Sequence, residues 1–127
     1  AASPTGPWSD PTVCTFDAVP NMQMWHVDVL RDGDGVWRGI FDLSLGGLSR
    51  GDAVHLGSST DGLDWNVSAS PLFASHSGTF DSAHMYRSGG ARDGDLVRMW
   101  VAGAALSGDW RIGYARVPIA AWPDPPS

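Results

Sequence analysis

Apolar and polar residues alternate with a period of two over most of the chain, as is typical of half-buried β-strands. In residues 24–30, Val27 and Val29 fall on one side of a strand, and His26 and Asp28 fall on the other. Glycine and proline recur too often for an amphipathic helix. The pattern predicts strands over residues 12–16, 24–30, 36–43, 52–58, 65–67, 82–87, 96–103 and 110–116.

One four-residue motif occurs twice, 61 positions apart, as Arg31-Asp32-Gly33-Asp34 and Arg92-Asp93-Gly94-Asp95. Each copy lies between two apolar-rich runs. Asp-Gly in such a place is a strong hairpin signal, because glycine accepts the positive φ of a tight turn. The first copy, extended to Gly35, also contains part of a calcium loop, but the rest of that loop is missing and a plain hairpin is favoured. We interpret the chain as two copies of one antiparallel unit.

The order of strands after each motif supports this interpretation. Ile112-Gly113-Tyr114-Ala115 takes the place in the second unit that Val54-His55-Leu56-Gly57 takes in the first. A repeated four-stranded unit of about 50 residues is typical of a β-propeller blade. We therefore predict an all-β fold of propeller blades, each a four-stranded antiparallel sheet, that form an incomplete ring in this chain. The alternative is a small β-sandwich, in which the repeat would be accidental.

The predicted organisation is a single β domain over residues 1–127. Its parts are a linker or edge segment over 1–17, a first blade-like repeat over 18–69, a second over 70–117, and a Pro-rich tail over 118–127. Because blades cannot bury their faces alone, we expect further blades, either from the same parent chain or from identical copies. Three copies of two blades would close a six-bladed ring.

Composition narrows the range of functions. The net charge of −6 disfavours nucleic acid and an anionic membrane surface, and no apolar run is long enough to insert into a membrane. All fourteen acids are Asp and all eight bases are Arg, so the chain has no Schiff-base lysine and no glutamate general acid. Cys14 is alone, which excludes an internal disulfide and a cysteine-based zinc site, and we expect it in the core. No metal and no cofactor is predicted.

Three segments resemble one enzyme superfamily. Trp25-His26-Val27-Asp28-Val29, followed by Asp34-Gly35-Val36-Trp37, is similar to the second blade of five-bladed furanosidase-type glycoside hydrolases, which include arabinanases, β-xylosidases and fructosidases. Asp81-Ser82-Ala83-His84-Met85-Tyr86 resembles the opening of their third blade, which typically reads Glu-Gly-Pro-His. The turn over residues 59–65 resembles their Ser-x-Asp-Gly-x-x-Trp turns. The resemblance covers roughly residues 22–117.

The resemblance implies roles for two carboxylates. Such enzymes use an Asp base from the first blade, a second-blade Asp that tunes the pKa of the acid, and a third-blade Glu acid. Asp28 stands at the tuning position and Asp81 at the acid position, but Val27 and Ala83 replace prolines of the family and Asp81 is one methylene shorter than Glu. The first blade with its base is not in this chain. Glycoside cleavage needs two carboxyl groups about 5 to 9 Å apart, so we expect no catalysis by this chain alone.

Aromatic and imidazole side chains are the predicted ligand-binding groups. Trp25, Tyr86 and Trp110 are candidate platforms for sugar rings, and His26 and His84 are candidates for hydroxyl recognition. The structural alternative is that these residues and Asp28 tie adjacent blades together. A metal site of His26, Asp28 and His84 fits by ligand type but has no motif spacing behind it. Trp37, Trp65 and Trp100 are assigned to packing.

These observations predict a carbohydrate-binding propeller module that is secreted or displayed on a surface, such as the receptor-binding part of a phage tail. One alternative is a fragment of an inverting or retaining glycoside hydrolase that uses Asp28 and Asp81. Another is a structural propeller that makes protein contacts only.

Overall fold

The computed structural model describes residues 5–17, 19–45, 53–75 and 81–127, and in these ranges the protein is all-β apart from one 3-10 turn. The strands are β1 (Thr15–Phe16), β2 (Met22–Arg31), β3 (Trp37–Leu45), β4 (Ala53–Ser59), β5 (Asp64–Val67), β6 (Phe73–Ala74), β7 (His84–Asp93), β8 (Leu96–Ala104) and β9 (Trp110–Pro118). The 3-10 turn η1 (Ile119–Ala121) follows β9. Asp52, at the start of a predicted strand, lies outside the described residues, as do residue 18 at the start of the first predicted repeat and residues 76–80 within the second.

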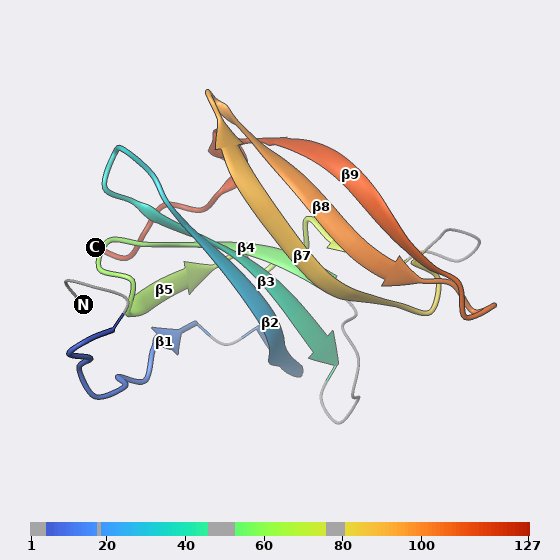
Figure 1. Cartoon of the computed structure of the whole chain (residues 1–127), viewed down its shortest axis with the longest axis horizontal. Helices are drawn as coiled ribbons and strands as arrows, with labels where there is room; N and C mark the ends of the chain where they lie inside the picture. Colours follow the sequence, from blue (N-terminus) through green and yellow to red (C-terminus); the bar gives the residue numbers. More distant parts are fainter. Residues whose placement is uncertain (1–4, 18, 46–52, 76–80) are drawn as a thin grey trace.

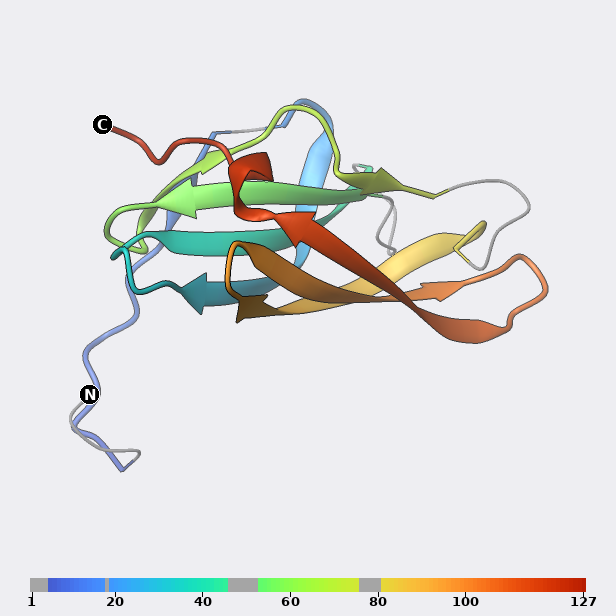
Figure 2. The same cartoon turned by 90° about the horizontal axis from the view of Figure 1, so that it is seen from above.

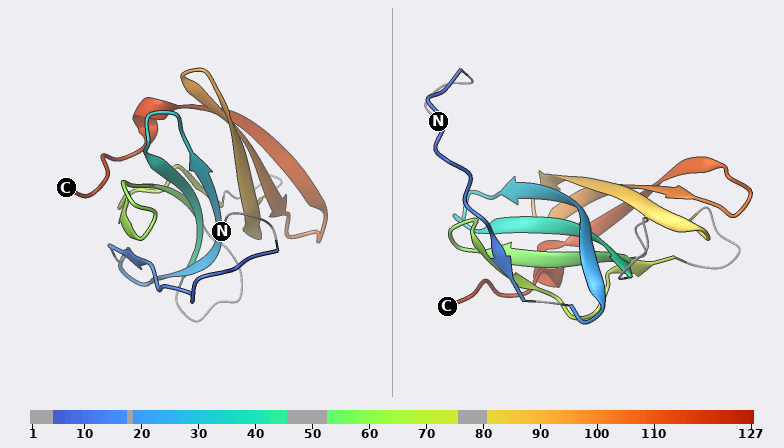
Figure 3. Two further views of the ribbon diagram at one scale, coloured as in Figure 1. Left: turned by 60° about the vertical axis from the view of Figure 1, so that its left-hand side comes forward. Right: turned by 90° about the horizontal axis from the view of Figure 1, so that it is seen from below.

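The first sheet, here called the N-terminal sheet, is an antiparallel meander of β2, β3, β4 and β5. Two short strands extend it, of which β1 falls within the strand predicted over residues 12–16 and β6 was not predicted. β1 pairs in parallel with β5, and β6 pairs with β4. Figure 1 and the left view of Figure 3 show that this sheet curls into a half-barrel, with β1 at its edge beside β5.

The second sheet, here called the C-terminal sheet, contains the three antiparallel strands β7, β8 and β9. It lies against one face of the N-terminal sheet, as Figures 2 and 3 show, and β7 runs beside β2. β7 continues to Asp93, six residues beyond the strand end that the sequence predicted. The fold therefore consists of two stacked antiparallel sheets, one for each copy of the repeated motif.

The two motifs form hairpin turns of different length. In the first, Asp32 pairs with Val36 through its N–H, and the positive φ of 82° falls on Gly35 rather than Gly33. In the second, Asp93 pairs directly with Leu96 and Gly94 takes a φ of 61°. The first hairpin thus has one more residue in its turn, and the strands that follow are offset by 60 positions instead of 61.

A second irregularity repeats along with the motif. A β-bulge interrupts the β2–β3 ladder between Met24 and His26, and another interrupts the β7–β8 ladder between Met85 and Arg87. The bulges are 61 positions apart, as the motifs are. Bulges bend a strand locally and are specific features of a sheet. The two bulges therefore lie at equivalent positions of the two sheets.

The strand registers assign equivalent residues in the two sheets. Arg31 pairs with Trp37, and the equivalent Arg92 pairs with Val97. Continuing these ladders makes Ile40 equivalent to Trp100 and Leu56 to Tyr114. The equivalences that follow on β4 and β9 are Val54 with Ile112, His55 with Gly113, Leu56 with Tyr114 and Gly57 with Ala115. This is the alignment that the sequence predicted.

The sheets pack front to back. We define the back face of each sheet by Ile40, Val54 and Leu56 or their equivalents, and the front face as the opposite one. In the core between the sheets, Ile40, Val54 and Leu56 on the back face of the N-terminal sheet pack against the front face of the C-terminal sheet. The front residues in that core are Met85, Val97, Met99, Val101 and Val117. Stacked propeller blades have this order, whereas a sandwich that buries equivalent faces does not.

The Pro-rich segment after β9 is part of the core. Trp122 is buried between the sheets, and its indole N–H donates a 3.2 Å hydrogen bond to the carbonyl of Gly39. Asn66 donates to the carbonyl of Asp124 at 2.7 Å. These contacts fasten the end of the chain to the N-terminal sheet.

One sequence-based assignment is wrong, and another is not met within this chain. Cys14 is exposed and its thiol donates a hydrogen bond to the carbonyl of Gly62, because β1 lies at the rim of the half-barrel and not in its core. Trp65 is buried and Trp37 packs against it partly, as expected, but Trp100 is 44% exposed. Trp100 belongs to a back face that nothing in the described chain covers. No helix in the described ranges is long and apolar enough to cross a membrane.

Candidate functional site

Two aspartates on the back of the N-terminal sheet hold the edge of β7. The Asp42 carboxylate accepts hydrogen bonds from the N–H of Ser88 at 2.9 Å and from its hydroxyl at 2.8 Å. Asp28 accepts from the N–H of Gly90 at 2.9 Å. β7 is an edge strand of the C-terminal sheet, so its outward N–H groups would otherwise have no strand partner. Asp28 therefore makes an inter-sheet bond of the kind that the structural alternative predicted.

Asp42 is a residue that the sequence reasoning did not single out. It is fully buried, it pairs across the ladder with His26, and burial raises the pKa of its carboxyl above the ordinary 3.8. The two hydrogen bonds from Ser88 and the nearby His26 and Arg87 act in the opposite direction on that pKa. A signal was present in the sequence, since Asp42 interrupts the apolar strand Ile40-Phe41-Asp42-Leu43.

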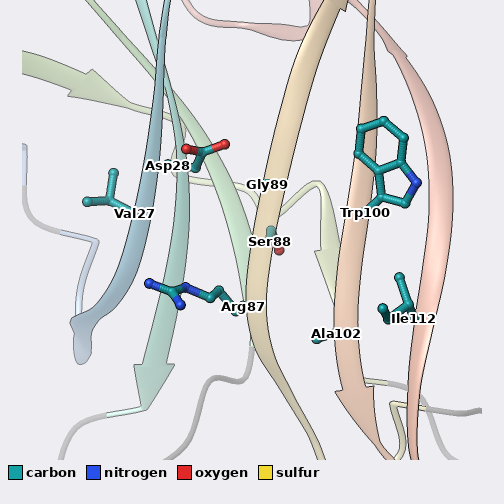
Figure 4. Close-up of a pocket in the computed structure, with 8 residues that line it drawn as sticks. All are labelled: Val27, Asp28, Arg87, Ser88, Gly89, Trp100, Ala102 and Ile112. Carbon is teal, nitrogen blue, oxygen red and sulfur yellow. The ribbon is translucent and has the colours of Figure 1, made fainter.

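A groove of about 390 Å³ opens where β2 meets the back face of the C-terminal sheet. Figure 4 shows its lining: Val27, Asp28, Arg87, Ser88, Gly89, Trp100, Ala102 and Ile112. The Arg87 side chain points toward β2, while the Trp100 and Ile112 side chains stand on the far strands. The groove thus combines a carboxylate, a guanidinium and an indole face. Its volume is in the range of small-ligand sites.

The structure brings the five predicted ligand-binding residues together in one row of rings. His26 lies edge-to-face against Trp25, with ring centroids 5.6 Å apart, and against Tyr86 at 5.0 Å. Tyr86 meets Trp110 at 5.4 Å, and Trp110 meets His84 at 5.1 Å. The row runs from β2 across β7 to β9. Its members Trp25 and Tyr86 are the two bulge residues, so the repeated bulge places both rings in the row.

Two polar atoms in this row have no hydrogen-bond partner within the described chain. They are Nε1 of Trp25 and Nε2 of His26, and both are buried. A buried donor or acceptor without a partner costs about 1 to 3 kcal/mol, so such groups generally have a partner in the functional state. At the other end of the row, Tyr86 and Trp110 are exposed. The row therefore offers unsatisfied polar atoms inside and open aromatic surface outside.

The predicted acid-position residue lies at the start of the same strand. Asp81 is buried in the turn that leads into β7, three residues before His84. Asp28 borders the groove, but the chain does not place His26, Asp28 and His84 in a metal-binding arrangement. In the described ranges, no group of three His, Cys, Asp or Glu side chains is placed to hold a metal ion.

Comparison with known proteins gives a fold relationship. No protein-family model matches the sequence, and no curated protein matches it. Among solved structures, the chain is similar to an N-acetylgalactosamine deacetylase from F. plautii, crystallised in complex with blood group B trisaccharide. The TM-score is 0.63 at 24% identity, and the match covers 76% of this chain and 33% of that chain. The chain therefore spans about one third of that enzyme's length and shares the fold of that part.

Proposed function

We infer that the chain is a carbohydrate-binding module of the β-propeller type that is non-catalytic by itself. The observation that carries this proposal is the row of rings from Trp25 to Trp110, with its two unpartnered ring nitrogens. Aromatic faces stack on the apolar C–H surface of sugars, and a Trp or Tyr also offers a polar tip to a hydroxyl. The row supplies open aromatic faces at Tyr86 and Trp110, and its two unpartnered nitrogens lie buried toward the other end.

The neighbouring groove supports the same class of ligand. Arg87 adjoins Tyr86 in sequence, and Ile112 is two residues from Trp110 on the same strand, so the groove and the row are continuous. Sugar hydroxyls both donate and accept hydrogen bonds, which suits a site with one carboxylate and one guanidinium. The fold neighbour is itself a carbohydrate enzyme crystallised with a trisaccharide, and this agrees with the proposal without naming a sugar.

Catalysis by this chain is the weaker proposal. Asp28 accepts the N–H of Gly90, and Asp42 is occupied by Ser88, so both carboxylates of the back face serve the joint between the sheets. A hydrolase function would need Asp81 as the acid and a base from outside the described residues. We place the module in a secreted or surface-displayed protein, the setting in which a receptor-binding module works.

A glycan array with the purified chain tests the proposal. Trp110→Ala removes an exposed ring of the row, and we expect at least about a tenfold loss of affinity for any glycan retained by the natural chain, given the ~1 to 3 kcal/mol of a typical aromatic contact. Trp8→Ala is the matched control, since Trp8 is exposed and lies in the N-terminal segment away from the row. Absence of glycan binding, or equal loss in both variants, would reject a carbohydrate site in this row.

The hydrolase alternative needs a separate assay. The natural chain should release no sugar from arabinosides, xylosides or fructosides during incubation. Release that Asp28→Asn abolishes, with the fold intact by circular dichroism, would replace the binding proposal with the catalytic one.

A further inference from the structure

The centre of the back face of the C-terminal sheet is apolar and open, and Arg98 and Arg116 flank it on the side of the second motif turn. Trp100, Ile112 and Tyr114 are between 44% and 73% exposed, and they are neighbours on β8 and β9. Their equivalents in the N-terminal sheet, Ile40, Val54 and Leu56, are the residues that the C-terminal sheet covers. The chain thus presents to solvent the same face that it uses inside to bind a sheet. Contiguous apolar surface of this kind marks an interaction site.

The front face of the N-terminal sheet is open along β2 at the other end of the stack, whereas Phe41 and Leu43 of β3 are buried there in a second apolar cluster with Trp65. Val27 and Val29 on β2 are exposed there, beside an apolar groove of about 410 Å³ that also contains Met24, Trp37 and Phe41. This is the face whose equivalent in the C-terminal sheet is buried between the sheets. The stack of two sheets therefore exposes a back face on one side and part of a front face on the other. Head-to-tail association requires two such different surfaces.

The side chains at these two open faces match one another. In the internal interface, Asp42 holds Ser88, and Asp28 holds Gly90. The registers make Ala102 equivalent to Asp42 and Gly89 equivalent to Asp28.

On the partner side, the same registers make Val27 equivalent to Ser88 and Val29 equivalent to Gly90. In the internal interface, an aspartate of the back face meets a small residue of the front face. At the two open faces, a small residue of the back face, Ala102 or Gly89, would meet a valine of the front face. The summed side-chain volume of each facing pair is thereby kept about the same, and both members of the pair become apolar. The open back face is therefore complementary to the open front face of this same chain.

The motif turns carry a matching charge pair. Asp32 binds Arg38 within the first turn and Arg92 of the second turn, the latter at 2.6 Å. In the second turn the equivalent Asp93 binds the equivalent Arg98 at 2.7 Å, and its carboxylate is half-exposed. Asp32 binds Arg92 across the internal interface, so at the open back face Asp93 would bind the residue equivalent to Arg92. That residue is Arg31. Arg31 is exposed at the front end of the stack, above the Trp37 ring.

We propose that the back face of the C-terminal sheet binds the front face of the N-terminal sheet of a second copy of this chain, with Asp93 of one copy paired to Arg31 of the other. The interface is heterologous, and a rotation that closes it yields a ring of stacked sheets. The groove between β2 and Trp100 is then walled by the second copy. Sugar binding is a separate property, and either can fail without the other.

Sedimentation equilibrium of the purified chain tests the association. We expect concentration-dependent masses at multiples of the 13.5 kDa monomer. Tyr114→Asp places a charge on the back face and Val27→Asp places one on the front face. Each should weaken association by at least about tenfold, because burying an unpaired charge is costly. Arg111→Asp, near the start of β9 and away from the motif turns, is the control and should associate like the natural chain.

A charge exchange tests the orientation. Arg31→Asp alone and Asp93→Arg alone each place like charges across the joint and should weaken self-association by about tenfold. An equimolar mixture of the two variants should recover association, because each junction then has opposite charges. Circular dichroism checks that each variant is folded. A natural chain that stays monomeric at millimolar concentration, or a mixture no stronger than its components, overturns the proposal.

Discussion

The Asp32 carboxylate of the first Arg-Asp-Gly-Asp turn binds the Arg92 guanidinium of the second turn at 2.6 Å. Asp32 also binds Arg38, so one buried carboxylate joins a strand of its own sheet to the turn of the other sheet. The repeated motif is therefore a hairpin signal in sequence and a joint between the two sheets in space.

Asp32 and its equivalent Asp93 are expected to differ in their effect on stability. Asp32→Ala leaves the buried Arg38 with only Asp34, and we expect a loss of about 2 to 4 kcal/mol, as for other broken buried pairs. Asp93→Ala breaks an exposed pair with Arg98, which solvent screens, and should cost clearly less than Asp32→Ala. Urea unfolding at low protein concentration measures both. Equal losses would contradict the burial argument.

Asp42 should make stability depend on pH. Burial raises its folded pKa above the 3.8 of the unfolded chain, so its contribution is fully present below pH 3.8 and is lost as the pH rises through the folded pKa. Asp42→Asn has no such titration. The unfolding free energy of the natural chain should therefore fall relative to that of the variant as the pH rises above 3.8. Parallel pH profiles of the two proteins would show that Asp42 does not titrate as expected.

Asp61 should behave in the opposite way. Its carboxylate accepts the N–H groups of Leu63 and Asp64 at 2.8 and 3.0 Å and the hydroxyl of Ser59 at 3.0 Å, and these bonds lower its pKa below 3.8. The stability it contributes is present above pH 3.8 and is lost as the pH falls through the folded pKa. NMR titration should find this lowered pKa, and Ser59→Ala should raise it. An unchanged pKa in that variant would exclude the hydroxyl as a cause.

Two adjacent glycines should respond differently to alanine. A Cβ on Gly90 would lie 2.8 Å from the Ile40 side chain and 2.9 Å from that of Val97, inside the core between the sheets. Overpacking of this kind costs about 1 to 3 kcal/mol. A Cβ on Gly89 meets only the Asp28 carboxylate, at 3.5 Å, and should be tolerated. Thermal unfolding of Gly90→Ala and Gly89→Ala measures the difference, and a greater loss at Gly89 would contradict the packing described.

Much of the fold could be predicted because its information is local. Alternation over β2, β3, β7 and β8 and the Asp-Gly turns require only neighbours along the chain. β6 was not predicted, because a two-residue strand has too few positions to show a period. Its pairing with β4 decides that it is a strand.

The candidate site likewise has features that the sequence predicts and features that depend on distant contacts. The types of its residues were visible in sequence, and the row of rings contains the five that were chosen. Asp42 was missed, because its importance arises from Ser88, 46 positions away. The exposure of Trp100 in this chain was not predicted either, since an alternating strand does not reveal which of its faces finds a partner.

The sequence by itself determined that this chain forms repeated antiparallel hairpins, since turn chemistry and strand period act over a few residues. Only the tertiary structure decided that the sheets stack front to back, that Asp28 and Asp42 hold an edge strand, and that one aromatic face is left open. Those outcomes depend on which surfaces meet, and the contacts that select them join residues far apart in the chain.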